Sequence, residues 1–475
     1  GEQFGYRVAI STHTVAVIAR GANIESDKIG SAYVKEVCEN PTDISSGSPT
    51  ASPTELFSTS PTDIPSVSQL PSISPSGRCS DDKKKMVKLE KRVAELEGRC
   101  GEAVPSTSPT LSVPTQPGLC EETPCTSTAL VKLPQTGIRK LYSIGESIAV
   151  MGDTLVVGSP NDSYNERNDT RGVLVGAAYV YSRESRQGES PGEWVQTQRL
   201  QGSTGGYKRY FSSAIAFDGD TMLIGAYGDR GLHTNGNSGS AFVFTLQAGQ
   251  WTETHKLAPY DTMKGHLFGW SVAVHGDTLV VGAPGYGLRN TPGHGFAYVF
   301  SMEGETVVTM SKLVAVDEEG WENFGYSVAV SPGLVVVGAK DHDYNKVAMY
   351  GKGAVYVYTL DTRGSWTLAQ KLQATDREAN ARFGESVAVS DDGTVVVGAP
   401  GVESVYVFSC TTAGVCTEPQ VLRASGGSVA ISCNSIAVGN SGPVKLFTRD
   451  IEGGWEPTNQ IVPNEEAEGE QFGYR

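Results

Sequence analysis

A short motif recurs seven times along this chain of 475 residues and constrains its fold more than any other feature. Each copy has an alternating apolar stretch, a turn that is Gly-Asp or Asp-Gly in most copies, and a second apolar stretch ending near Gly-Ala-Pro. This pattern is typical of a tight β-hairpin. The clearest copies lie at 144–160, 211–227, 268–284, 324–340 and 383–400, and the weaker ones at 425–440 and 4–20.

Two more apolar segments follow each hairpin. The third segment of a repeat reads like FAYVF (296–300), and the fourth often opens with Trp and ends near Lys-Leu, as in WTETHKL (251–257). Four antiparallel strands repeated seven times predict an all-β fold, a seven-bladed β-propeller. One blade cannot bury its faces alone, so we expect the ring of blades to close.

The FG…VAV…VVGAP…AYVF pattern resembles the FG-GAP repeat of integrin α-subunit propellers and of algal and protist extracellular surface proteins. The resemblance covers most of the chain and implies an extracellular propeller, but it is much less informative about function. The sequence contains no G-x-S-x-G, P-loop or H-E-x-x-H motif. We therefore predict that the protein is not an enzyme and requires no cofactor.

Two Ser/Thr/Pro-rich segments separate the first copy of the motif from the other six. Such segments cannot form a packed core, and their composition favours extended, O-glycosylated stalks. A strand at 127–133 matches the fourth-strand pattern that the first copy lacks. The predicted parts are strands one to three of blade seven (1–38), a stalk (39–78), a short helix (79–100), a second stalk (101–124) and the remaining propeller (125–475).

Residues 1–7 and 469–475 both read GEQFGYR. The simplest interpretation is that the sequence is one period of a longer tandem chain. Residues 1–38 would then complete the propeller of a neighbouring copy. The alternative is an artefact of how the sequence was assembled.

The segment between the stalks predicts an amphipathic helix. Its apolar residues follow the 3-4-3 spacing of a heptad seam, and a cysteine extends the register at each end. The charges beside the seam suit a parallel pair of helices. A single helix docked elsewhere explains the pattern equally well. The residues of the seam are Cys79, Met86, Leu89, Val93, Leu96 and Cys100.

Cysteines occupy matching positions in two blades. Cys410 and Cys416 flank the turn between strands three and four of blade five, and Cys38 and Cys125 would take the same places in blade seven. We predict a disulfide within each pair, the second one between neighbouring copies. A disulfide framework implies an oxidising, extracellular setting. Free buried thiols are the alternative.

The resemblance also suggests calcium, which integrin-type propellers bind in D-x-D-x-D-G-type loops after the second strand. The nearest match is Asp341, Asp343 and Asn345 in blade four. Lys346 and Met349 stand where the loop would have Gly and an acid, so the shell of oxygen ligands is short. The alternative is a solvated polar loop.

Asn161 and Asn168 are N-glycosylation sequons in one loop of blade one. The net charge of −15 argues against nucleic acid as a partner, because phosphate binding needs clustered Lys and Arg. No apolar run reaches the roughly 18 residues that a membrane span needs. The partners we expect are further copies of this chain and the glycans on its stalks.

These features predict a structural or adhesive extracellular repeat protein. Its most concrete form is a subunit of a glycosylated cell-surface filament with pendant propellers. The alternative is an integrin-like receptor ectodomain that binds a protein or glycan through its propeller loops.

Overall fold

The computed structural model describes the propeller part of the chain. Contacts divide the chain into one unit formed by Gly1–Glu39 with Gly118–Arg475 and a second formed by Asn40–Pro117. The predicted stalks and the predicted helix between them lie outside the residues that the structure describes. These are 3–12, 14–20, 30–36, 130–134, 145–162, 175–184, 192–203, 209–230, 238–285, 295–315, 323–342, 351–374, 380–440 and 442–462.

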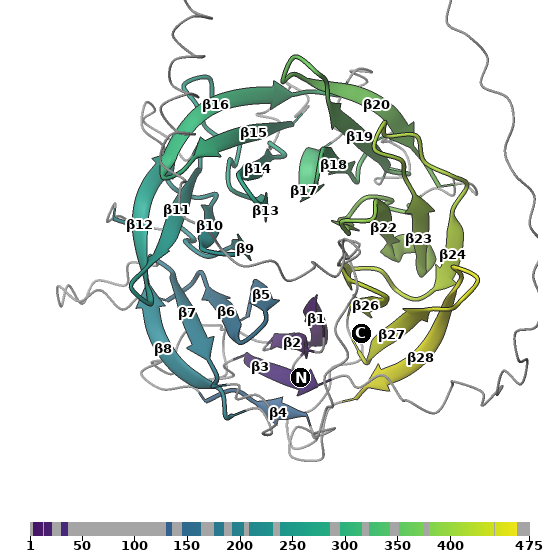
Figure 1. Ribbon diagram of the computed structural model, residues 1–475, viewed down its shortest axis with the longest axis horizontal. Helices are drawn as coiled ribbons and strands as arrows, with labels where there is room; N and C mark the ends of the chain where they lie inside the picture. Colours follow the sequence, from purple (N-terminus) through teal and green to yellow (C-terminus); the bar gives the residue numbers. More distant parts are fainter. Residues whose placement is uncertain are drawn as a thin grey trace, which may run out of the picture. The chain divides into compact units, whose positions relative to one another are not determined.

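Seven four-stranded antiparallel sheets surround a central axis, which makes the protein a seven-bladed β-propeller (Figure 1). Each sheet follows chain order from the axis outward. Blade one contains β5 (Ile148–Met151), β6 (Thr154–Ser159), β7 (Ala177–Ser182) and β8 (Val195–Leu200); blade two contains β9 (Ala214–Asp218), β10 (Thr221–Ala226), β11 (Ser240–Gln247) and β12 (Gln250–Leu257). Blade three contains β13 (Ser271–His275), β14 (Thr278–Ala283), β15 (Phe296–Glu303) and β16 (Thr306–Leu313).

The other four blades repeat this plan. Blade four contains β17 (Phe324–Ser331), β18 (Leu334–Ala339), β19 (Ala354–Leu360) and β20 (Trp366–Leu372); blade five contains β21 (Ser386–Val389), β22 (Thr394–Ala399), β23 (Ser404–Ser409) and β24 (Gln420–Arg423). Blade six contains β25 (Ser428–Ser432), β26 (Ser435–Gly439), β27 (Val444–Arg449) and β28 (Trp455–Ile461); blade seven contains β1 (Gln3–Ser11), β2 (Thr14–Arg20), β3 (Ser31–Glu36) and β4 (Val131–Lys132). Among the described residues, the only helical element is the 3-10 turn η2 (Pro400–Val402).

The hydrophobic core lies between neighbouring blades. The second and third strands are buried almost throughout, as in β14 and β15, because sheets pack against both of their faces. The fourth strand faces solvent on one side, and its exposure alternates along most of its length, as in β20. The cluster between blades two and three shows the pattern, with Leu223 of one blade packed beside Leu279 and Tyr298 of the next.

Where the motif carries a Phe-Gly pair, as in blades three, four and five, that pair joins its blade to the preceding one. Phe268 is fully buried, forms a parallel bridge with Gly239 of blade two, and packs edge-on against Tyr298 at 5.4 Å. Gly269 has a φ of +90°, and a Cβ there would lie 2.2 Å from the carbonyl oxygen of Ser240. Only glycine fits both the backbone angle and the close approach.

The same joint closes the ring. The serine of the motif donates a hydrogen bond to the backbone of the next blade, as Ser271 Oγ does to Gly325 O at 2.9 Å. Between blades six and seven, Ser428 Oγ accepts from Val8 N at 3.2 Å. The purple strands β1–β3 thus lie between the yellow strands of blade six and the blue strands of blade one (Figure 1).

Blade seven is built from two distant segments of the sequence. β4 pairs with β3 through Val34 opposite Val131 and Tyr33 opposite Lys132. The paired part of the expected 127–133 strand covers residues 131–132. The structure contains one chain and pairs these segments within it, so exchange of blade seven between copies stays a prediction.

Candidate functional site at the mouth of the central channel

The innermost strands surround a cavity of about 210 Å³ on the propeller axis. In several blades, the residue directly after the Phe-Gly pair lines this cavity. Where a copy lacks that pair, the residue at the equivalent position does so. That position differs from blade to blade, whereas the flanking residues of the motif recur. The cavity lining includes Glu146, Ser213, Trp270, Tyr326 and Glu385 at this position.

Four aromatic side chains form a continuous run beside this cavity. Tyr210 stacks on Tyr227 with ring centroids 5.0 Å apart. Tyr227 lies 4.9 Å from Trp270, and Trp270 lies 5.5 Å from Tyr326. We call these four residues the aromatic arc. All four are partly exposed, whereas the phenylalanines of the neighbouring joints, such as Phe268 and Phe324, are fully buried.

The arc arises from departures from the repeat. Tyr227 stands where other copies of the motif have the proline of Gly-Ala-Pro. Lys340 takes that place in blade four, and its ammonium lies 3.9 Å from the Tyr326 ring centroid, a cation–π contact. Sequence reasoning missed these two positions because each is a single departure within a copy that otherwise matches the motif clearly.

Ionisable groups continue the arc into blade five. Arg382 Nε forms an ion pair with Glu385 Oε2 at 2.6 Å. Burial raises the pKa of Glu385, and the positive charges of Arg382, Lys340 and Arg7 oppose this only in part. Burial, together with the nearby Glu385, raises the pKa of Tyr326 to about 12. The phenol is therefore neutral at physiological pH.

The predicted calcium ligands are only partly described. Asp341 accepts a hydrogen bond from Asn323 Nδ2, whereas Asp343 and Asn345 lie outside the described residues. Within the described ranges, no group of three or more His, Cys, Asp or Glu side chains is placed to hold a metal ion. Calcium at this loop stays a prediction.

In blades one and two, ion pairs hold an acid at the position that His342 occupies in blade four, one residue after Asp341. Asp162 lies 3.0 Å from Arg199 and accepts a hydrogen bond from the Tyr179 hydroxyl at 2.5 Å. Asp229 is fully buried and lies 2.5 Å from Lys256. Burial opposes ionisation of Asp229, but its hydrogen bond and ion pair with Lys256 help to lower its pKa. In both blades the basic partner, Arg199 or Lys256, stands directly before the final Leu of the fourth strand. This ending is the sequence feature that could have indicated the ion pairs.

The cysteines and sequons are described in part. A disulfide of 2.04 Å joins Cys410 to Cys416, and Cys433 is also disulfide-bonded. Asn161 Nδ2 donates to Glu146 Oε1 at 3.4 Å, close to the channel mouth. The remaining predicted residues lie outside the described ranges: Cys38, Cys125, Asn168 and the seam residues Cys79, Met86, Leu89, Val93, Leu96 and Cys100.

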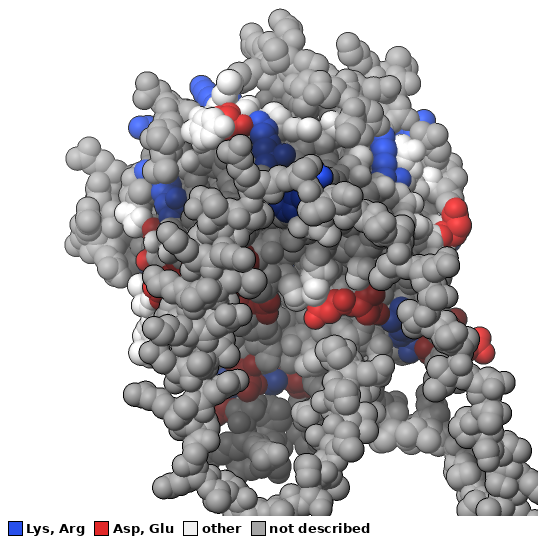
Figure 2. Space-filling model, turned by 45° about the horizontal axis from the view of Figure 1, so that its top comes forward, with Lys and Arg blue, Asp and Glu red and all other residues white. Residues whose placement is uncertain are grey.

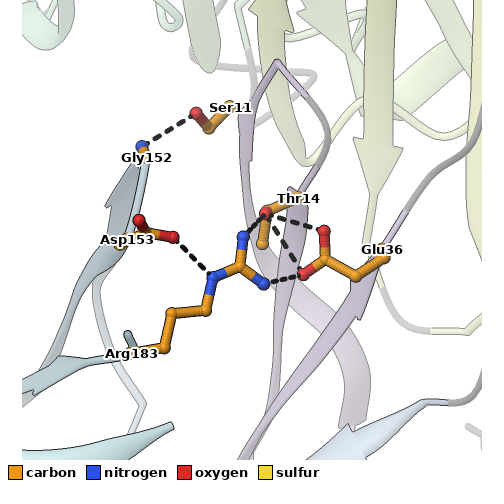
Figure 3. Close-up of polar contacts among 6 residues, drawn as sticks. All are labelled: Ser11, Thr14, Glu36, Gly152, Asp153 and Arg183. Atoms are coloured by element: carbon orange, nitrogen blue, oxygen red, sulfur yellow. Dashed lines mark hydrogen bonds and ion pairs between the residues drawn. The ribbon is translucent and has the colours of Figure 1, made fainter. Parts of the chain in front are cut away.

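A polar clasp joins blades one and seven (Figure 3). Arg183, which follows β7, lies 2.5 Å from Glu36 of β3 and 2.8 Å from Asp153. It also donates to Thr14 Oγ1 at 3.3 Å, and its guanidinium lies over Trp194 at 4.8 Å. The side chains of Arg183 and Glu36 are only 9% and 13% exposed.

A similar clasp joins blades five and six. Arg449 lies 2.5 Å from Asp392, donates to Thr394 Oγ1 at 3.4 Å, and lies over Trp455 at 5.5 Å. This second clasp is more exposed, with 25% of the Arg449 side chain and 46% of the Asp392 side chain accessible. On the face shown in Figure 2, the coloured basic side chains lie mainly in the upper part of the view and the acidic ones mainly in the lower part.

The fold and its joints define a β-propeller built on a repeated Phe-Gly motif. The chain carries FG-GAP repeats: that repeat family matches residues 194–244, 251–300, 307–358 and 366–408. Each match runs from the fourth strand of one blade through the third strand of the next, or nearly so, and therefore contains the joint between them. No curated protein sequence matches the chain.

Several solved structures share the fold at low identity. A periplasmic gluconolactonase from Pseudomonas aeruginosa is 15% identical, with a TM-score of 0.45 over 66% of this chain and 84% of that one. A putative 6-phosphogluconolactonase from Bacteroides fragilis is 10% identical, with a TM-score of 0.47 over 71% and 88%. Sqt1 from Chaetomium thermophilum is 14% identical, with a TM-score of 0.46 over 97% and 88%. We draw no functional conclusion from these likenesses.

No helix in the part of the chain that the structure describes is long and apolar enough to cross a membrane.

Proposed function

We propose that this chain is a structural or adhesive extracellular repeat protein whose propellers hang from a glycosylated stem. The observation that carries the proposal is the construction of blade seven. The chain leaves this blade after Glu36 and rejoins it at Leu130, beside the same edge of the sheet. Because β3 and β4 are adjacent antiparallel strands, the two connections lie close together. A propeller attached in this way is held at one edge.

The segment between these connections has the composition of a stem. Residues 39–78 and 101–118 are rich in Ser, Thr and Pro, which favours an extended chain open to O-glycosylation. Two further observations support an extracellular setting. FG-GAP repeats typically occur in extracellular proteins, and the Cys410–Cys416 disulfide is expected in an oxidising compartment.

Further copies of the chain are the partners in this proposal. The GEQFGYR sequence stands at both 1–7 and 469–475, as it would in a tandem array. Strands β1–β3 connect to β4 only through residues 37–130, so the same strands can complete the ring of another copy without changing any joint. The proposal assigns no catalytic step to the propeller.

Surface labelling of intact cells tests the extracellular role. An antibody against the propeller should label filaments outside cells that have not been permeabilised. An antibody against a cytosolic protein serves as the control and should label permeabilised cells only. Propeller labelling that appears only after permeabilisation would contradict the proposal.

A further inference from the structure

We propose that the mouth of the central channel binds a neutral oligosaccharide, with Trp270 of the aromatic arc as its platform. This proposal does not depend on the filament role, because it concerns only the propeller. It assigns a ligand class to a surface that a purely structural propeller would not need.

The first argument is the exposure of the arc. The phenylalanines at the joints between blades are buried, as Phe268 and Phe324 are. Trp270 instead lines the cavity. Its neighbours Tyr227 and Tyr326 are inclined to it by 49° and 47°, so neither stacks flat on the indole. A flat apolar surface beside polar groups suits the apolar face of a pyranose ring, because such ligands are amphipathic.

The second argument is the kind of polar group beside the arc. Glu146 and Glu385 line the same cavity, and Arg382 lies against Glu385. Carboxylates and guanidinium groups are planar and offer two neighbouring hydrogen-bonding positions. Two such positions match two neighbouring hydroxyl groups of a sugar. The arrangement supplies acceptors as well as donors, as hydroxyl recognition requires.

The third argument is charge balance, which favours a neutral ligand. Positive charges from Arg7, Lys340 and Arg382 surround Glu385, with Asp341 also close. Glu146 adds a third carboxylate at the cavity. An anionic or cationic ligand would meet like charges as well as opposite ones, whereas a neutral polyol would not.

Ring spacing favours a saccharide over a Pro-rich peptide. Proline recognition uses grooves between aromatic side chains in which a proline ring fits. Neighbouring rings of the arc lie in contact, with centroids 4.9–5.5 Å apart, and leave no such groove between them.

Isothermal titration of the intact chain with a panel of neutral tetrasaccharides tests the proposal. The probes are cello-, manno-, xylo- and chitotetraose, each at up to about 10 mM because weak sugar sites have millimolar dissociation constants. We expect at least one to bind, and Trp270→Ala to weaken that binding at least about tenfold, or roughly 1.4 kcal/mol. Trp270→Phe keeps an aromatic platform, so it should lose less affinity for the sugar than Trp270→Ala. The phenylalanine variant keeps the test available if the alanine variant folds poorly.

The matched control is Tyr260→Ala. Tyr260 is 78% exposed and does not line the cavity, so its removal should leave sugar binding unchanged. Glu385→Gln should weaken binding without lowering the melting temperature. Three results would overturn the proposal: no binding by any probe, binding that Trp270→Ala leaves intact, or saturable binding of a Pro-rich peptide at Trp270 in place of the sugars. None of these results bears on whether the chain forms filaments.

Discussion

Removing the Arg183 side chain should loosen the joint between blade seven and blade one. Arg183→Ala deletes the ion pairs to Glu36 and Asp153, the hydrogen bond to Thr14 and the contact with Trp194. The variant leaves the largely buried Glu36 carboxylate with only the Thr14 hydroxyl, at 3.3 Å, among the partners shown in Figure 3. A buried charge that loses its main partner is the costly outcome.

The structure bounds the size of the effect. Breaking a buried pair by removing one partner costs about 3–5 kcal/mol. Asp153 is 42% exposed, so its loss adds less than about 1 kcal/mol. Losing the contact with Trp194 adds about 1 kcal/mol. Because Glu36 retains some solvent access, we take the buried pair at its lower bound of about 3 kcal/mol and expect a total of about 4 kcal/mol.

Urea unfolding, followed by tryptophan fluorescence and by hydrogen exchange of β1–β3, measures this cost. The matched control is Arg449→Ala, which removes the corresponding clasp between blades five and six. Its partners are more exposed, so we expect a loss of only about 1 kcal/mol. Arg183→Ala should also speed amide hydrogen exchange in β1–β3 more than in the other strands, because β1–β3 form one side of the joint.

A double variant distinguishes the cost of leaving the Glu36 carboxylate unpaired from the cost of losing the contacts of Arg183. Glu36→Gln combined with Arg183→Ala removes the unpaired carboxylate and should recover part of the lost stability. The reasoning would be refuted if Arg183→Ala cost no more than Arg449→Ala, or if the double variant lost the sum of the two single effects.

Three further predictions concern other parts of the chain. Burial raises the pKa of Glu385, so the folded state binds a proton more tightly than the unfolded one and stability falls as pH rises from the unfolded pKa, about 4.3, through the folded value. Glu385→Gln should abolish that decline in pH-dependent melting curves, and an unchanged decline would contradict the assignment. Reducing the Cys410–Cys416 disulfide should lower the melting temperature modestly, since its loop is short, and Cys410→Ser with Cys416→Ser should lower it equally. Residues 39–78 should carry O-linked sugars, and Asn161 an N-linked one; peptide masses equal to the bare polypeptide would show that they do not.

The fold follows from the sequence because its repeat is both local and periodic. Each hairpin alternates with the period of a strand, and the fixed Phe-Gly pair marks where one blade meets the next. Positions such as Phe268 and Gly269 are therefore predictable from the copies that keep the pair. β4 could be located only by its likeness to other fourth strands, and only two of its residues pair.

The channel mouth could not be predicted in the same way. Tyr227 and Lys340 occupy a position where the motif expects proline, and Trp270 and Glu385 occupy a position that the motif leaves open. Their proximity results from the closure of the ring, since they come from four different blades. The ion pairs of Asp162 and Asp229 likewise join residues whose pairing depends on the register within a blade.

Electron cryomicroscopy of the native protein tests the central claim most directly. The account predicts seven-bladed propellers in which β1–β3 and β4 form one sheet, each propeller joined to its stem at the edge of blade seven by two neighbouring connections. A chain that passes through the central channel, or connections that leave opposite faces of the propeller, would contradict it.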